Sequence, residues 1–513
     1  MKKGFTLTEL IGVVIILALI ALLAFPPILN AIRETKNEIS DASKEILYNA
    51  ANLYVSDNSN TLVNVEGNTY CVTINDLIKG EYLPTKVYDS VTGEEIPIDN
   101  IIEIKVENNQ YKYNMNNECV SVIAPTPEPE EEYVDNSGAN KPLLLNNMIP
   151  VYYDGTNWIY ADTKKEWYDY DAKEWANAVV LNSGVTKNVG DTIAETDIAL
   201  WYVWIPRYKY QLFNANNGSV NEQEIQIKFE TSTLTTGNVT CTDAVSGTAG
   251  TSSEVCENAV NGNWYTHPAF TFGEQELTGF WVGKFEVSGA INNITIKPNV
   301  ASLRNVTVSN FFYSIQNLNN VYSINGDSHM MKNMEWGAVA YLSHSKYGTC
   351  TNGNCVEVSI NSNSSYYTGG GASNAYKTNV AQSTTQNIYG MYDMVGCSME
   401  YIMGNIVNTN GTFYSSSAGF IITPNSKYYD SYSYNTLYTN HSLGKLGDAT
   451  KEIAKTFGST SGAWYNTTLS FPVISSPWFV KGCKYDSNGF FYLGWGDGRA
   501  YSHVSTRSVL VAN

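Results

Sequence analysis

The stretch that decides how this chain is organised is KKGFTLTELIGVVIILALIALLAFP, at residues 2–26. It opens with two lysines, and we expect residues 1–4 to be a short basic leader. An uncharged run then extends from Leu10 to Leu29. About 20 apolar residues are enough to cross a bilayer as a helix. The stretch therefore predicts a transmembrane segment over residues 10–29.

Two features distinguish this segment from an ordinary signal peptide or anchor. A secretory signal has its small-residue cleavage site after the apolar run, whereas here the unusual residues come before it. Glu9 puts a carboxylate at the start of the apolar run, where burial of a charge is costly and a simple anchor has no use for one. A plain membrane anchor remains the alternative interpretation.

Gly4, Phe5 and Glu9 stand at the spacing of a known signature, and the stretch resembles the N-terminus of type IV prepilins and pseudopilins. The resemblance implies that a prepilin peptidase cuts between Gly4 and Phe5 and methylates the new amine of Phe5. Glu9 would then pair with the Phe5 ammonium of a neighbouring pilin subunit, which offsets the cost of burying either charge alone. The expected location is the inner or cytoplasmic membrane before assembly, and a type IV pilus on the bacterial surface afterwards.

The apolar pattern continues beyond the first segment. Residues such as Ile39, Ile46 and Leu53 recur at nearly helical spacing, so we expect one pilin helix over residues 5–56 with one face packed on a head domain.

The rest of the chain divides by composition. Its 513 residues exceed the usual span of one domain. Residues 57–122 alternate short apolar runs, which predicts a small β-stranded pilin-like head. Residues 123–145 contain a run of Pro and Glu that cannot pack, so they are expected to form an extended linker. Residues 146–513 are expected to form one large extracellular domain.

Composition limits the classes of partner. The formal net charge is -18, and a nucleic-acid partner is not expected because phosphate binding needs a basic surface. The 37 Tyr, 39 Gly and 11 Trp residues give a composition closer to antibody loops than to a cytosolic enzyme. Composition thus favours a binding protein.

The eight cysteines fall into nearby couples, with two left over. With no CxxC motif and only five histidines, they favour disulfides in an exported protein over a zinc site. Buried thiols are the alternative, and spacing alone does not fix the connectivity. The couples are Cys71 with Cys119, Cys241 with Cys256 and Cys350 with Cys355, leaving Cys397 and Cys483.

Several blocks of the large domain resemble the formylglycine-generating-enzyme family. They are GFWVGKFEV at 279–287, NMEWGAVAY at 333–341, NIYGMYDMVGCSMEY at 387–401, VKGC at 480–483 and STRSV at 505–509. That family has a variant of the C-type lectin fold, which retroelement-diversified binding proteins also use. The resemblance implies an α+β fold class: a long pilin helix with a small β head, followed by a C-type-lectin-like domain.

The same comparison argues against catalysis. Enzymes of the family bind copper through two cysteines, and Ser487 and Tyr492 stand near those positions here. Without paired thiolates there is no soft-metal site, so we do not expect an enzyme. Cys397 and Cys483 replace an asparagine and a glycine where the family brings two strands together, which implies a disulfide between them.

A calcium site is also implied by the resemblance. The family holds calcium with a loop that matches Asp393 and Glu400 for the carboxylates and Gly396 and Ser398 for main-chain carbonyls. Calcium takes six to eight hard oxygen ligands, and this loop offers several of them. The alternative is that both acids are solvated or hydrogen-bonded.

The ligand face is expected near the C-terminus, where the binding relatives of the family have theirs. Aromatic residues interleaved with charges are what a protein-binding hot spot needs, although some of these rings must belong to the core. The predicted ligand-binding residues are Tyr485, Asp486, Ser487, Phe490, Phe491, Tyr492, Trp495, Asp497, Arg499, Tyr501 and His503.

Three functions are compatible with these features. The first is a minor or tip pilin that displays an adhesion domain for an unknown protein or glycan on a cell, phage or host surface. The second is a pseudopilin of a secretion or DNA-uptake system, for which the large domain would be unexplained. The third is a membrane-anchored modifying enzyme, which the missing cysteines disfavour.

The N-terminal assignment predicts the form of the mature chain. Mass spectrometry should find methylated Phe5 at its amino terminus. Glu9→Leu should still insert into the membrane but assemble poorly, because the neighbouring Phe5 ammonium loses its charge partner. An intact Met1 on fibre-incorporated protein would contradict the prepilin assignment.

Overall fold

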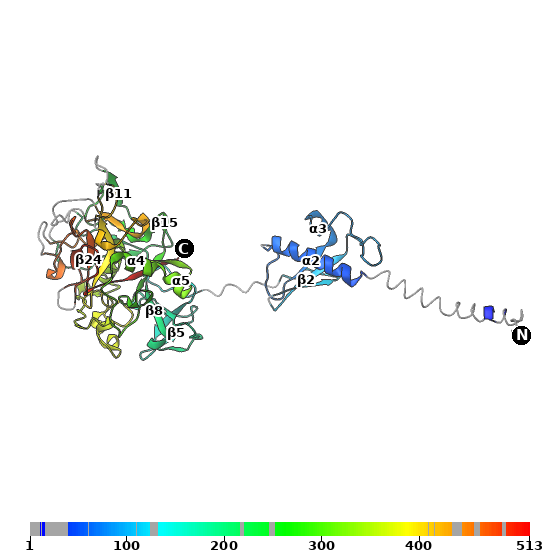
Figure 1. The fold of residues 1–513 in the computed structure, drawn as a ribbon, viewed down its shortest axis with the longest axis horizontal. Helices are drawn as coiled ribbons and strands as arrows, with labels where there is room; N and C mark the ends of the chain where they lie inside the picture. Colours follow the sequence, from blue (N-terminus) through cyan, green and yellow to red (C-terminus); the bar gives the residue numbers. More distant parts are fainter. Residues whose placement is uncertain are drawn as a thin grey trace. The chain divides into compact units, whose positions relative to one another are not determined.

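The structure is a computed structural model that describes the chain in segments. They form two compact units, Met1–Glu131 and Glu132–Asn513 (Figure 1). The predicted processing and assembly residues Gly4, Phe5 and Glu9 lie outside the described residues. The described residues are 11, 13–15, 39–59, 61–108, 110–123, 132–215, 220–245, 252–408, 410–414, 416–432, 444–455, 462–484 and 489–512.

The first unit is a helix on a small antiparallel sheet of order β1-β2-β3. The Ser40 hydroxyl accepts the Ser43 N–H at the start of the helix, which satisfies a backbone donor that would otherwise lack a partner. Leu47 of the helix and Ile102 and Ile104 of the sheet share one buried core. The elements are α2 (Asp41–Asp57), β1 (Thr69–Thr73), α3 (Ile74–Lys79), β2 (Ile101–Glu107) and β3 (Gln110–Met115).

The predicted α+β fold class, with a long N-terminal pilin helix and a C-type-lectin-like domain, was wrong. In the part of the chain that the structure describes, strands hold 30% of the residues and helices 17%, in many small sheets and five short α-helices. Among the described residues the longest helix is α2 with 17 residues, and none has the length and apolar character to cross a membrane. The predicted segment 10–29 lies almost wholly outside the described residues.

The prediction also misplaced the buried face of the helix. Ile46 and Leu53, expected to pack, are 54% and 59% exposed, whereas Leu47 and Ala51 are fully buried. One residue along a helix turns the side chain by about 100°, so a small error in spacing selects a different face.

The second unit is built around an eight-stranded antiparallel sheet of order β19-β27-β16-β8-β6-β4-β5-β7. All nine residues of β8 are buried, because this strand of Val, Ile, Leu and Trp is covered on both faces. The bounds are β4 (Met148–Tyr153), β5 (Trp158–Tyr160), β6 (Asn177–Leu181), β7 (Thr192–Ile193), β8 (Ile198–Pro206), β16 (Gly279–Gly283), β19 (Gly326–Met330) and β27 (Ser508–Ala512).

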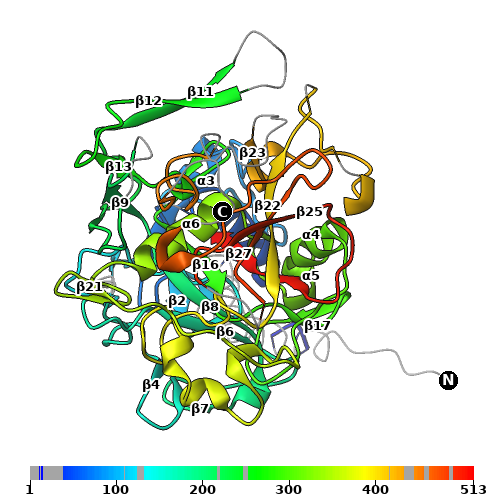
Figure 2. The ribbon, with the colours of Figure 1, turned by 90° about the vertical axis from the view of Figure 1, so that its left-hand side faces the viewer.

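A five-stranded sheet lies beside it, in the order β23-β22-β24-β25 with β26 also paired to β22 (Figure 2). The chain leaves this sheet at the end of β26 and enters the larger sheet as β27, with only Arg507 between them. The bounds are β22 (Met399–Ile406), β23 (Asp430–Tyr432), β24 (Trp478–Lys481), β25 (Leu493–Gly496) and β26 (Val504–Thr506).

The remaining elements are short. Three helices and several small sheets complete the described part of this unit. They are β9 (Tyr208–Gln211), β10 (Ile227–Phe229), β11 (Thr240–Val245), β12 (Ser252–Glu257), β13 (Trp264–Thr266), β14 (Thr271–Phe272), β15 (Gln275–Glu276), β17 (Ser288–Ala290), β18 (Asn293–Thr295), α4 (Val308–Gln316), α5 (Leu318–Tyr322), α6 (Asn333–Ser343), β20 (Cys350–Thr351) and β21 (Asn354–Cys355).

The three disulfides expected between neighbouring cysteines are confirmed. One ties β1 to the end of the first unit, and the other two cross the β11–β12 and β20–β21 hairpins. They join Cys71 to Cys119, Cys241 to Cys256 and Cys350 to Cys355.

The fourth predicted disulfide is wrong, because Cys397 and Cys483 are buried without being bonded to each other. Burial raises the pKa of the Cys397 thiol, and nearby Glu286 raises it further, so this thiol stays protonated and oxidises poorly. Cys483 lies near a different group, the phenol of Tyr492, whose pKa is raised by burial and then by this thiol. The two sulfurs thus have different neighbours.

A buried charge network fastens α6 to the central sheet. His329 on β19 lies 2.9 Å from Oε1 of Glu335 on α6, and its ring stacks on Phe272 at 4.7 Å. Asp327 lies on the other side of the ring and also binds Lys427 at 2.7 Å. Burial lowers the pKa of His329, but Glu335 and Asp327 outweigh it and hold the pKa above 6.5. Burial alone would raise the pKa of Glu335, but the charge of His329 outweighs burial, so the pKa of Glu335 lies below its ordinary value.

This network predicts that the free energy of unfolding depends on the protonation of His329. A histidine whose folded pKa is raised stabilises the fold below its unfolded pKa, and this contribution disappears as pH rises through the folded value. The free energy of unfolding should therefore fall as pH rises above 6.5. Urea titrations at several pH values would measure it.

Glu335→Gln is the matched control, because it keeps a hydrogen-bond acceptor and removes the charge. The decline above pH 6.5 should flatten in this variant. His267 and His344 do not interfere, since burial holds their pKa values at about 3 and about 4. An equal slope in both proteins would assign the decline to other groups.

Candidate ligand-binding site

A pocket of ≈ 350 Å³ lies on the five-stranded sheet. It brings together four residues of the predicted ligand face, Tyr492, Trp495, Tyr501 and His503. Three apolar side chains, a tyrosine, a serine and two glycines complete the lining. The additional lining residues are Met399, Tyr401, Ser470, Val480, Gly494, Gly496 and Val504.

Two glycines of β25 make room for the rings around the pocket. A Cβ atom on Gly494 would lie 2.8 Å from the hydroxyl oxygen of Tyr492, and one on Gly496 would lie 2.7 Å from that of Tyr401. Such contacts are far closer than carbon and oxygen tolerate, so only glycine permits these tyrosine positions. Residues 494 and 496 therefore act as a floor without side chains.

Aromatic rings surround this floor. The Tyr501 ring lies 6.5 Å from that of Tyr401 and 5.5 Å from that of His503. Trp495, between the two glycines, is 48% exposed. Rings of this kind offer contact area at low entropic cost, so the pocket suits an apolar group of a ligand.

The charges predicted for the ligand face interact with each other. Asp497 accepts a hydrogen bond from Nε of Arg499 at 2.5 Å and another from the Tyr501 hydroxyl at 3.2 Å. Burial raises the pKa of Asp497, but these donors, Arg499 first, bring it below its ordinary value. Asp497 is thereby a positioning residue that holds Tyr501 beside the pocket.

The remaining predicted residues are not on this surface. Phe490 and Phe491 are fully buried, and the Phe491 ring packs 4.6 Å from His344 and 5.5 Å from Trp464. They belong to the core. Tyr485, Asp486 and Ser487 lie outside the described residues.

Seven of the eleven lining residues were not predicted from the sequence. Met399 and Tyr401 alternate with buried Glu400 along β22, so strand alternation was a usable signal for them. Ser470, Val480 and Val504 carry no local signal, because pairing between distant strands brings them to the pocket.

The residues predicted to bind calcium form a different kind of cluster. Asp393 accepts hydrogen bonds from Nδ2 of Asn361 at 2.8 Å and from the Gly369 N–H at 2.9 Å. Glu400 pairs with Arg507, whose Nη2 lies 2.6 Å from Oε1. All of these carboxylates are buried.

A third carboxylate completes this cluster. Glu286 accepts the Ser398 N–H at 2.9 Å through Oε1, while Oε2 has no hydrogen-bond partner among the described residues. Burial raises the pKa of Glu286 well above its usual value, with Glu400 and Asp393 adding to the effect. Burial and the two neighbouring carboxylates thus favour the neutral form of Glu286, while Glu400 forms the ion pair with Arg507.

This arrangement does not fit calcium. A guanidinium already occupies the position of a cation beside Glu400, and the oxygens of Asp393 are committed to Asn361 and Gly369. Burial raises the pKa of Asp393 to about 6, which weakens it further as a calcium ligand. Gly396 and Ser398 instead have backbone roles. Gly396 has a positive φ of 83°, and the Ser398 N–H donates to Glu286.

A second group of metal-ligating types, Cys241, Glu254 and Cys256, is likewise unsuitable. Its two sulfurs form a disulfide and cannot act as thiolate ligands.

Comparison with family models and with curated proteins identifies no relative. No family model matches the chain, and no curated protein matches it. The resemblances to prepilins and to the formylglycine-generating-enzyme family therefore rest on the quoted motifs alone.

The buried ion pair predicts a sharp stability effect. Arg507→Met should destabilise the second unit by about 3 to 5 kcal/mol, because it leaves the Glu400 carboxylate buried without its partner. Urea denaturation would measure this loss. Arg499→Met, which removes an exposed guanidinium, is the matched control and should shift the midpoint little.

Calcium can be tested on the same samples. Chelation with EGTA should leave the wild-type Tm unchanged. A drop in Tm that Asp393→Asn abolishes would restore the calcium assignment.

Proposed function

We propose that this chain is a surface-displayed adhesion subunit whose second unit binds a protein ligand. The observation that carries the proposal is the pocket lined by Tyr492, Trp495, Tyr501 and His503 over the Gly494 and Gly496 floor. Buried anchors and aromatic rings dominate the energetics of protein recognition.

The size and chemistry of the pocket favour an apolar anchor. A volume of ≈ 350 Å³ accepts one large side chain, and the lining offers rings, Met399 and two valines. The Tyr501 hydroxyl, held by Asp497, gives the lining a polar group that can bind the ligand backbone. An aromatic or long aliphatic side chain in an exposed segment of another protein suits this site.

The N-terminal motif supports display on a bacterial surface. Gly4, Phe5 and Glu9 match the prepilin signature, so the proposed partners are a prepilin peptidase, other pilin subunits and the membrane before assembly. A subunit with so large a second unit would crowd a fibre made only of itself, which favours a minor or tip position.

We do not propose catalysis. Ser487 and Tyr492 stand near the positions of the copper-binding cysteines in the resembled enzymes. The buried carboxylates Glu286, Asp393 and Glu400 have structural partners. A pseudopilin would leave the aromatic pocket without a use.

The proposal predicts that aromatic residues of the pocket matter for binding more than for folding. Peptides selected from a random display library on the purified full chain should carry an aromatic or aliphatic anchor. Tyr492→Ala, Trp495→Ala and Tyr501→Ala should each weaken their binding by about 2 kcal/mol or more, roughly 30-fold in Kd. Fluorescence titration would measure Kd.

Phe491→Ala is the matched core control. It should cost about 3 to 5 kcal/mol of stability, because it empties a fully buried site. The pocket variants should melt close to the parent. If all three melt as low as Phe491→Ala, or bind the peptides as the parent does, the ligand face lies elsewhere.

A further inference from the structure

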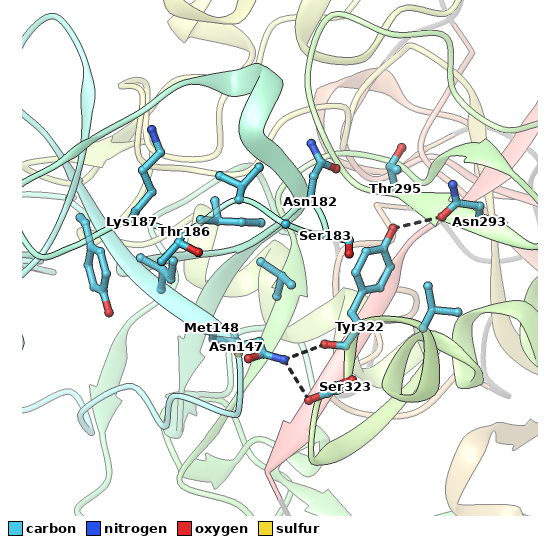
Figure 3. Close-up of a pocket in the computed structure, with 17 residues that line it drawn as sticks. Asn147, Met148, Asn182, Ser183, Thr186, Lys187, Asn293, Thr295, Tyr322 and Ser323 are labelled. Carbon is cyan, nitrogen blue, oxygen red and sulfur yellow. Dashed lines mark hydrogen bonds between the residues drawn. The ribbon is translucent and has the colours of Figure 1, made fainter.

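A second and larger pocket, of ≈ 720 Å³, lies at another part of the second unit (Figure 3). The ends of β4 and β6, the loop 182–187, β18 and α5 surround it. Its lining residues are Asn147, Met148, Ile149, Tyr160, Val180, Leu181, Asn182, Ser183, Gly184, Val185, Thr186, Lys187, Asn293, Thr295, Val321, Tyr322 and Ser323.

The polar lining consists almost entirely of amides and hydroxyls. Lys187 is the one ionisable side chain of the lining other than tyrosine, and Asp197 neutralises it at 3.0 Å. No carboxylate lines the pocket, although the chain as a whole carries a formal net charge of -18. An uncharged ligand is therefore favoured over an anion or a cation.

Hydrogen bonds hold two of the three lining amides, Asn147 and Asn182, through their NH2 groups, while Oδ1 of the third, Asn293, accepts from the Tyr322 hydroxyl at 3.4 Å. Nδ2 of Asn147 donates to the carbonyls of Tyr322 at 3.1 Å and Ser323 at 3.3 Å. Nδ2 of Asn182 donates to the Thr196 carbonyl at 2.7 Å. Fixed acceptors of this kind recognise hydroxyl donors without rearrangement.

The exposed hydroxyls add both donors and acceptors. Ser183 and Thr186 are exposed, and within the described part of the chain neither hydroxyl makes a hydrogen bond. The Tyr322 hydroxyl donates to the Ile294 carbonyl at 2.8 Å and lies 3.4 Å from Oδ1 of Asn293, the contact drawn in Figure 3, and these contacts fix its ring at the side of the pocket. Tyr160 provides a second ring in the lining.

We propose that this pocket binds a neutral carbohydrate. Sugars present alternating hydroxyls and apolar C–H faces, and the pocket pairs amide and hydroxyl groups with two tyrosine rings and a floor of Met148 and Val180. This inference does not rest on the aromatic pocket, because the two pockets share no lining residue.

The test is a binding screen of the purified full chain. The probes are soluble oligosaccharides of glucose, galactose, mannose or N-acetylglucosamine, compared with sialylated and sulfated oligosaccharides. At least one neutral probe should bind, and isothermal titration calorimetry would measure its Kd. Thr186→Val and Asn293→Ala should each raise that Kd at least tenfold while leaving Tm unchanged.

Two variants make the test specific. Thr186→Ser keeps the hydroxyl and should restore most of the affinity. Thr233→Val removes an exposed threonine hydroxyl outside the pocket and should change nothing. Binding of charged probes alone, no binding of any probe, or neutral binding that Thr186→Val and Asn293→Ala leave intact would each overturn the proposal. Peptide binding at the aromatic pocket is measured separately, so the two proposals can fail independently.

Discussion

The fold of the second unit depends on the buried guanidinium of Arg507. This group binds Glu400 of β22, the Gly283 carbonyl at the end of β16 at 2.7 Å and the Tyr392 carbonyl at 2.9 Å. It stands where the chain passes from the five-stranded to the eight-stranded sheet. A buried charge is stable only when its hydrogen-bond partners are all in place. Arg507 therefore fixes the position of the five-stranded sheet relative to the eight-stranded sheet. That placement puts β25 and the rings around it at a fixed position.

Local features were predictable from the sequence, and features that depend on distant pairing were not. Cysteines separated by short loops, such as Cys350 and Cys355, meet because few other arrangements are open to them. Cys397 and Cys483 were paired by resemblance, but the sequence does not show that Cys397 lies beside Glu286. Whether these two cysteines form a disulfide depends on the directions of their side chains, which cannot be read from their spacing in the sequence.

The candidate site shows the same division. An aromatic-rich stretch near the C-terminus was a sound place to expect rings around a pocket, yet composition does not say which rings face inward. Phe491 is core and Trp495 is 48% exposed, although both are aromatic residues of one short segment. Tyr401 reaches the pocket through the parallel pairing of β22 with β26, in which it stands opposite Thr506. Such a register is a property of the assembled sheet.

The pocket combines two glycines, which fix how the rings pack, with exposed aromatic side chains, which contact the ligand. Because Gly494 and Gly496 have no side chains, the rings of Tyr492 and Tyr401 can lie directly against the backbone of β25, where a Cβ atom would collide with them. Trp495 and Tyr501 also line the pocket, and their side chains are exposed or partly exposed, so a substitution at either position changes the lining without touching the two glycines. A lineage of such chains could therefore acquire new ligands by point substitution while it inherits one scaffold unchanged.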